Sequence, residues 1–325
     1  MNPPAIGPDD DRRHLPGPEL QWSESCSFRL HAPDSGLAGS LRLAMRPNEG
    51  MTDVGLHFWL PDGGFVATRH VASPGTDPVV MEVGDARLEV IEPLRRWRIV
   101  HDGPAHSLDS AADAGDREAW HHSRIERLIV ELEFAAETEA VGFSETGPGA
   151  PSPREGFEQA GAWSGLVQVS GEAFAVAGSG FRERSWGIRD WQAPVRVRRF
   201  SFVAGRDAAV SATVIEGEGG VEWHHGWIAR EGRIERLRSV IVATETTPDG
   251  LLPRSVRLEL AGEHGGLHLA TGEVLGCAPM RSARNRRETL VCESVLRFEM
   301  DGRHGHGTAE HLVQLDARGA PVVPL

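Results

Sequence analysis

From residue 22 onward, hydrophobic and polar residues alternate along the chain in short segments separated by turn signals. A period of two places one face of an extended segment in a core and the other toward water, so each segment predicts a β-strand. The turns between them carry glycine and acidic residues, as in Glu231-Gly232 and Asp301-Gly302. The strands that we predict are 40–46, 54–60, 86–92, 95–101, 124–134, 166–170, 196–203, 208–216, 222–230, 234–243, 255–261, 267–275, 289–300 and 307–315.

Helical periodicity is rare in this chain. Segment 124–136 is rich in helix formers, but Leu128, Val130, Leu132 and Phe134 recur at every second position, which favours a long strand. A short helix is predicted near residues 155–160. Many strands at regular spacing without interleaved helices predict an all-β protein made of antiparallel barrels or sandwiches.

The chain of 325 residues is long enough for two domains. Residues 147–153 read Gly-Pro-Gly-Ala-Pro-Ser-Pro, a run that suits a linker or an exposed loop and neither a strand nor a helix. The run divides the chain into an N-terminal domain, 1–150, and a C-terminal domain, 151–325. Each half has about the strand count of a lipocalin-like barrel, so we predict two such barrels packed together.

Composition removes several functions from consideration. The net charge is -13, whereas a nucleic-acid partner requires a basic surface. The chain contains neither tyrosine nor lysine, which excludes Schiff-base, P-loop and kinase lysines. No glycine-rich dinucleotide fingerprint opens a helix, so no cofactor is expected. No run of about 18 apolar residues and no signal peptide is seen, so we expect a cytoplasmic protein without a membrane segment and leave homo-oligomerisation open.

Residues 178–191 (GSGFRERSWGIRDW) gather two tryptophans, two acids and three arginines within a few positions. If this segment is a strand, Glu183 and Ser185 lie on one face, and Arg182, Arg184 and Trp186 lie on the other. Charges beside aromatic rings survive burial only when they are paired or functional. The segment therefore predicts either a structural network of arginines and acids or a protected catalytic site.

Four short motifs, in order along the chain, resemble those of the hydroxyneurosporene synthase (carotenoid hydratase) superfamily of double-lipocalin proteins. The segment 180–187, GFRERSWG, resembles its Gly-x-x-Asp-His-x-Trp-Gly motif. The resemblance extends to WSES at 22–25, RPNEG at 46–50 and GHGTAEH at 305–311. It implies two lipocalin-like barrels, with the ligand site in a barrel mouth or between the domains.

The resemblance also implies a reaction. Hydratases and cyclases of this kind protonate a carbon–carbon double bond, which a carboxylic acid held neutral by burial can do. The motif's Asp-His pair is Glu183-Arg184 here, and an arginine cannot shuttle protons near pH 7. We therefore predict Glu183 and Asp190 as catalytic residues. The donor should be the buried acid without an arginine partner, and we favour Asp190.

The predicted substrate is a hydrophobic isoprenoid, steroid or polyketide-like molecule, and the enzyme would be a hydratase, cyclase or isomerase without a cofactor. The alternatives are a non-catalytic carrier of a similar ligand and a structural protein with no ligand. The residues predicted to bind the substrate are Trp186, Trp191, Arg184, Arg189, Glu24, Glu310, His225 and Trp227.

A metal site is not predicted. His304, His306 and Glu310 share a strand face, but the surrounding glycines favour a turn and no zinc signature occurs. The three cysteines, Cys26, Cys277 and Cys292, have no metal-ligand spacing and are predicted to be buried, reduced thiols.

Overall fold

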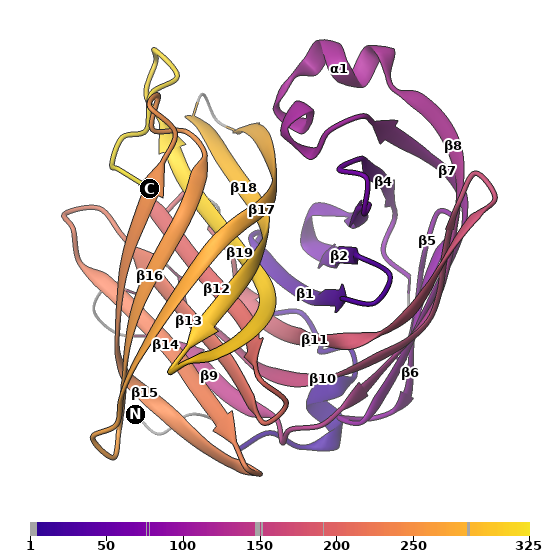
Figure 1. Cartoon of the computed structure of the whole chain (residues 1–325). Helices are drawn as coiled ribbons and strands as arrows, with labels where there is room; N and C mark the ends of the chain where they lie inside the picture. The colour runs from indigo at the N-terminus through magenta and orange to yellow at the C-terminus, as the bar shows by residue number, and fades with distance from the viewer. Residues whose placement is uncertain are drawn as a thin grey trace. The chain divides into compact units, whose positions relative to one another are not determined.

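The computed structural model describes residues 5–75, 77, 79–146, 150, 152–190, 192–284 and 287–325. The fold is nearly all β, as predicted, with nineteen strands named along the described chain (Figure 1). The short helices are η1 (Pro8–Asp11), η2 (Pro47–Glu49), η3 (Ala111–Gly115) and α1 (Arg117–His122). None of the helices in these ranges is long and apolar enough to cross a membrane.

The chain divides into two compact units. Unit 1 comprises Met1–Asp109, Glu118–Ser144 and Pro153–Arg189, and unit 2 comprises Ser110–Arg117, Glu145–Ser152 and Asp190–Leu325. The predicted division at 150/151 therefore differs from the one observed. The chain returns to unit 1 after the proline-rich run and leaves it again at Arg189.

Unit 1 is built around an antiparallel sheet of eleven strands in the order β4-β3-β2-β1-β11-β10-β8-β7-β6-β5, with β9 paired to β10. Strand β4 also pairs with β7, so the sheet curves back on itself. The bounds are β1 (Trp22–Ala32), β2 (Leu37–Arg46), β3 (Met51–Trp59), β4 (Phe65–Ala72), β5 (Val80–Val83), β6 (Ala86–Glu92), β7 (Arg96–Leu108), β8 (Arg124–Ala136), β9 (Val141–Glu145), β10 (Arg154–Val169) and β11 (Glu172–Ile188).

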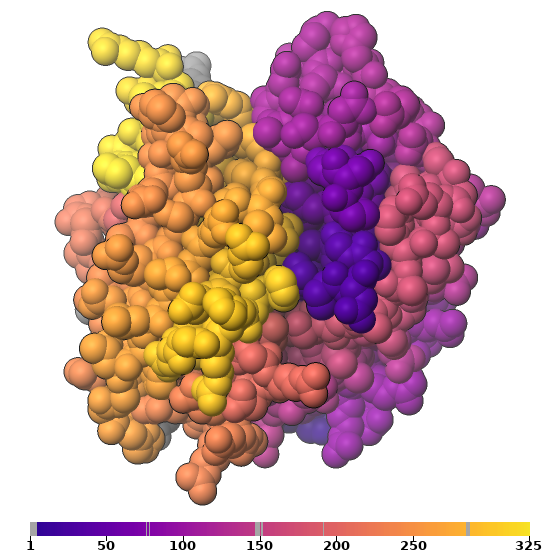
Figure 2. All heavy atoms as spheres, in the orientation of Figure 1, coloured from indigo at the N-terminus to yellow at the C-terminus, as the bar shows by residue number. Residues whose placement is uncertain are grey.

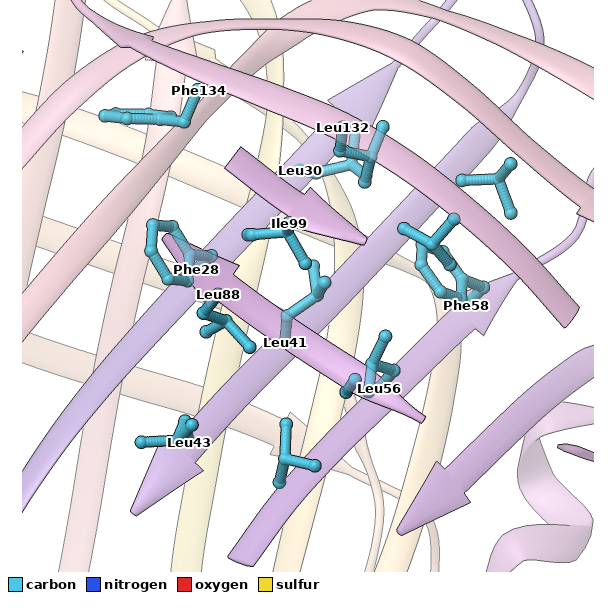
Figure 3. Close-up of a cluster of buried hydrophobic side chains, with 14 of the residues drawn as sticks. Phe28, Leu30, Leu41, Leu43, Leu56, Phe58, Leu88, Ile99, Leu132 and Phe134 are labelled. Carbon is cyan, nitrogen blue, oxygen red and sulfur yellow. The ribbon is translucent and has the colours of Figure 1, made fainter. Parts of the chain in front are cut away.

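The inward side chains of unit 1 form one apolar cluster, because alternate residues of each strand point to the same side. Figure 3 shows side chains from neighbouring strands converging there, among them Phe28, Leu41, Phe58 and Ile99. All four are 1% exposed or less. The predicted helix near 155–160 was wrong: these residues belong to β10, where side chains on both faces are buried and the alternation of a strand is lost.

Unit 2 is a closed antiparallel barrel in which β12 to β19 follow one another and β19 pairs with β12. Its strands are β12 (Arg196–Ala204), β13 (Ala208–Glu216), β14 (Glu222–Arg230), β15 (Arg233–Thr246), β16 (Pro253–Gly262), β17 (Leu267–Arg284), β18 (Arg287–Met300) and β19 (Arg303–Leu315). Inward residues such as Phe200, Phe202, Leu258 and Phe298 form the core. The atoms of β15–β19 cover this interior on the face seen in Figure 2.

Two of the predicted turns close hairpins of the barrel. Glu231 and Gly232 have φ values of 51° and 74°, and Asp301 and Gly302 have values of 52° and 76°. A two-residue loop with both φ angles positive matches the right-handed twist of the strands it joins. These turns fix the registers of β14 with β15 and of β18 with β19.

Candidate functional site

Strand β11 carries the predicted site segment, and its neighbours on either side are β1 and β10. The predicted alternation is confirmed through residue 186. Arg182, Arg184 and Trp186 lie opposite Phe28, Cys26 and Glu24 of β1, on the inner face of the sheet. Glu183 and Ser185 lie on the outer face. The segment therefore makes two different clusters, which are described in turn.

On the inner face, Arg182 is held by a buried carboxylate. Its two terminal nitrogens donate to Asp11 at 2.7 and 3.0 Å, and Gln159 Oε1 accepts from its Nε at 2.8 Å. Asp11 ends helix η1 and is fully buried. Asp11 also accepts hydrogen bonds from Trp97 Nε1 at 3.1 Å and from the Leu94 amide at 2.5 Å. Every oxygen of this carboxylate is thus satisfied within unit 1.

Arg184 forms a second ion pair on the same face, with Glu24. It also donates to Cys26 Sγ at 2.9 Å and to the Arg12 carbonyl oxygen at 2.5 Å. Glu24 accepts from the ring of His14 at 2.9 Å, and that ring stacks on Trp186 at 4.0 Å. We call the two ion pairs and their neighbours the inner network. Buried charges that are matched one to one in this way are typical of structural bracing.

On the outer face, Glu183 lies directly opposite Glu158 of β10 and Ser27 of β1. Both carboxyl groups are buried, Glu158 at 4% and Glu183 at 9% exposure. Residues directly opposite each other in an antiparallel sheet have Cβ atoms about 4.5–5.5 Å apart. We call Glu158 and Glu183 the carboxyl pair.

Arg154 and the hydroxyl groups of two serines border the carboxyl pair. Arg154 Nη1 donates to Glu183 Oε1 at 3.5 Å and to Ser185 Oγ at 3.1 Å. The hydroxyl groups of Ser185 and Ser25 are hydrogen-bonded at 3.2 Å. The contact of Arg154 with Glu183 is longer than the Arg182–Asp11 contacts of the inner network.

Asp190, the favoured acid, lies beyond the end of β11 and is half-buried. Its carboxylate accepts the Gln192 amide at 2.9 Å, which caps a turn. The Arg189 amide donates to the Gln21 carbonyl oxygen at 2.9 Å. Trp191 lies outside the described residues. The catalytic role of Asp190 stays a prediction.

In unit 2, the strand registers bring three predicted substrate-binding residues to the outer face of the barrel. Glu310 lies opposite Arg199, Arg199 opposite Thr213, and Thr213 opposite His225. Trp227 follows His225 by two positions and shares its face. We call this set, extended by Glu293 opposite Glu310, the barrel-face row.

Sequence reasoning missed four charged residues of these two outer faces: Glu158, Arg154, Arg199 and Glu293. Glu158 lies in the segment predicted as a helix, and Arg154 lies between that segment and the predicted linker. Strand pairing was the missing information, because a residue becomes a site candidate here through the partner that lies opposite it in the sheet.

The histidine and carboxylate set considered for a metal lies on β19. His304 is exposed and its Nδ1 is 3.8 Å from a carboxylate oxygen of Glu299. Within the ranges that the structure describes, no three His, Cys, Asp or Glu side chains are grouped so as to hold a metal ion.

The fold has relatives among solved structures. A Nitrosomonas europaea protein provisionally identified as AttH is 15% identical, with a TM-score of 0.70 over 96% of this chain and 99% of that one. Kievitone hydratase from Nectria haematococca is 13% identical, with a TM-score of 0.60 over 90% and 88%. CghA in complex with Sch210972 is 12% identical, with a TM-score of 0.58 over 90% and 89%.

These similarities show that the chain shares the fold of these proteins. No curated protein matches the chain significantly in sequence. A family profile described as "Domain of unknown function (DUF7064)" matches residues 7–314.

Proposed function

We propose that this chain, which belongs to the DUF7064 family, is an enzyme that adds water to, or cyclises, an unsaturated hydrophobic small molecule. The carboxyl pair, Glu158 and Glu183, is its proton donor. The observation that carries the proposal is the register of β10 with β11, which sets two buried carboxyl groups directly opposite each other. Kievitone hydratase, a neighbour in fold, is a hydratase by name, which supports the reaction class.

The carboxyl pair suits this chemistry because its two members need not both be ionised. The protonated member donates its proton to a carbon of the double bond, which leaves a carbocation on the substrate and a carboxylate on the protein. Water then attacks the cation, and the carboxylate accepts the proton that the water loses. In a cyclisation, an internal double bond takes the place of water, and loss of a proton to the carboxylate ends the reaction.

Arg154 and the serines have supporting roles in this proposal. Arg154 contacts Glu183 and Ser185 together, so it fixes the orientation of the carboxyl pair. Ser25 and Ser185 supply hydroxyl groups that can hold the attacking water beside the pair. We assign Glu24 and Arg184 to bracing because they form a buried ion pair, and Trp186 because its ring stacks on His14. Glu310, His225 and Trp227 remain proposed substrate-binding residues on the barrel-face row.

The test compares Glu183→Gln with Asp190→Asn, since each variant removes a proton and keeps the shape of the side chain. The purified protein is incubated with an extract of small hydrophobic metabolites, and products are followed by mass spectrometry. A hydratase yields a product heavier by one water, and a cyclase yields an isomer of the substrate. Glu183→Gln should lower the rate by about 10²-fold or more and leave binding of the same compound intact.

The two variants separate the competing assignments. Asp190→Asn should retain most of the activity, and a large loss there with none in Glu183→Gln would move the donor to Asp190. Recovery of a bound ligand that the wild-type protein never converts would contradict the enzyme proposal and favour the carrier.

A further inference from the structure

Two of the three cysteines lie next to each other on the inner side of the closed barrel, apart from the residues of the proposed reaction. Cys277 is on β17 and Cys292 is on β18. Cys277 pairs with Ser294 and Cys292 pairs with Pro279, so the two thiols are diagonal neighbours on one face of the sheet. We call Cys277 and Cys292 the thiol pair.

The two thiols differ in exposure. Cys292 is fully buried in an apolar cluster with Leu290 and Val313, and its Sγ donates to the Leu251 carbonyl oxygen at 3.5 Å. Cys277 is only partly buried, so a small reagent can reach it. The pair therefore consists of one partly exposed residue, Cys277, and one fully buried residue, Cys292.

The same contacts give the two thiols different acidities. The interaction with Cys292 lowers the pKa of Cys277 below its ordinary value, whereas the contact with Cys277 and burial raise the pKa of Cys292. A thiolate is the attacking species in thiol–disulfide exchange. Cys277 is thus suited to react first and Cys292 to react second.

The backbone beside the pair has room to adjust. Pro279, opposite Cys292, has no amide hydrogen to donate to the strand ladder. The register of β17 with β18 also shifts between Val274 and Gly276, just before Cys277. Bulges bend a strand and increase its twist, which brings one diagonal of side chains closer. A disulfide needs Cβ atoms about 3.8 Å apart, closer than diagonal neighbours usually lie, so oxidation requires a local change in the twist of this stretch.

We propose that the thiol pair is a redox modification site, at which Cys277 and Cys292 form a reversible intramolecular disulfide when the protein meets a small disulfide such as oxidised glutathione. The Cys277 thiolate attacks one sulfur of the oxidised glutathione, forms a mixed disulfide and releases one glutathione thiolate. Cys292 loses its proton and attacks the Cys277 sulfur, and the second glutathione thiolate leaves. The two cysteine thiols are oxidised by two electrons and one glutathione disulfide is reduced to two thiols.

Cys26 provides an internal control for this reaction. It is buried in unit 1, where Arg184 donates to its sulfur, and burial raises its pKa to about 11. It should stay reduced under conditions that oxidise the thiol pair. The bridge closes a loop of about 15 residues in unit 2, and such a cross-link should raise the Tm of the transition that involves the barrel by about 5 °C or more.

The experiment equilibrates the full chain with reduced and oxidised glutathione at defined ratios and then blocks the remaining thiols in denaturant. Peptide mapping without reduction should find a 277–292 disulfide and a blocked thiol at Cys26. Dithiothreitol should restore three free thiols. In Cys292→Ser, Cys277 should instead accumulate as a mixed disulfide with glutathione, because the second thiol is missing. Cys292→Ala serves the same purpose if the serine variant does not fold.

Three outcomes would overturn the proposal. One is a wild-type protein in which Cys277 carries glutathione while Cys292 stays free. Another is a disulfide formed between two chains in place of one within the chain. The third is oxidation of Cys26 at the same ratio of glutathione forms as the thiol pair, which would show general unfolding in place of a specific site.

Discussion

Asp11 shows how one side chain can organise its surroundings. It is fully buried, yet its two oxygens meet both terminal nitrogens of Arg182, the Trp97 indole and the Leu94 amide. A sequence reader sees only one aspartate in a run of three near the N-terminus. Its importance depends on Arg182, which lies 171 positions further along the chain.

Asp11→Asn should lower the free energy of unfolding by about 3 kcal/mol, because the guanidinium of Arg182 would then be buried without a counter-charge. The measurement is a urea titration of the full chain, followed by tryptophan fluorescence. Asp102→Asn is the matched control. Asp102 pairs with Arg127 at 2.7 Å at the surface, so its loss should cost much less than the loss of Asp11. Equal costs in the two variants would contradict the bracing role of the inner network.

His311 predicts a pH dependence of stability. It is fully buried in the barrel beside Phe200, with Thr244 Oγ1 3.3 Å from its Nε2. Burial first, and then the charges of Arg198 and Arg196, lower its pKa from 6.5 to about 3. Below pH 6.5 the unfolded chain therefore binds a proton at His311 that the folded chain does not. The contribution of His311 to the free energy of unfolding is fully present above pH 6.5. It falls as the pH drops toward 3, by at most ~1.4 kcal/mol per pH unit.

His311→Gln should remove this contribution. Between pH 6.5 and 4.5, the wild-type protein should lose about 2 kcal/mol more of its unfolding free energy than the variant does. Urea titrations at several pH values measure the difference. The exposed His304 offers a control, since His304→Gln should follow the wild-type curve. A variant whose slope with pH equals that of the wild type would show that His311 is not held neutral.

At the scale of the element, the sequence was informative where one strand face is buried and the other is exposed. Strands β6 and β8 have this burial pattern, and their predicted ends lie within two residues of those observed. The end of strand β10 was predicted as 166–170, but its first part was missed because both faces are buried over most of Arg154–Gly161. The local alternation of hydrophobic residues thus predicted strands, but it could not predict which strands pair with each other in the sheet.

The pairing of strands also depends on glycines, which leave room for a neighbouring side chain. Trp163 of β10 reaches across β11 and donates from Nε1 to the Arg29 carbonyl oxygen of β1 at 2.9 Å. Gly180 lies beneath this indole, and a Cβ at that position would overlap both the ring and the Arg29 carbonyl. Three strands are thereby tied together over a glycine. In the sequence, Gly180 appeared only as part of a motif.

At the scale of the whole molecule, the all-β fold class was predicted correctly, whereas the two compact units are divided at other positions than 150/151. Unit 1 needs β10 and β11, since β1 pairs with β11 and β8 pairs with β10. A division at 150 removes both strands and leaves β1 and β8 as open edges. The linker-like run 147–153 therefore does not end unit 1. After it the chain returns to unit 1 and forms β10 and β11, which complete the sheet.

Fragments of the chain test this division. The fragment 1–189 contains all the strands of unit 1, so it should give a cooperative urea transition and a β-type circular dichroism spectrum. The fragment 1–150 should lack a cooperative transition, because it also loses Arg182 opposite Asp11. If 1–150 unfolds with the same midpoint as 1–189, the earlier boundary is the true one.

The pairing of β1 with β11 has a consequence for biosynthesis. The N-terminal turn and the first strand leave the ribosome long before their partners exist, since 171 residues separate Asp11 from Arg182. At 5–20 residues per second, translation of that interval takes roughly 10 to 35 seconds. During this time the nascent chain carries an unpaired strand edge and an acidic turn without its counter-ion. Unit 1 is therefore expected to close late, and its open edge is a natural binding site for a chaperone.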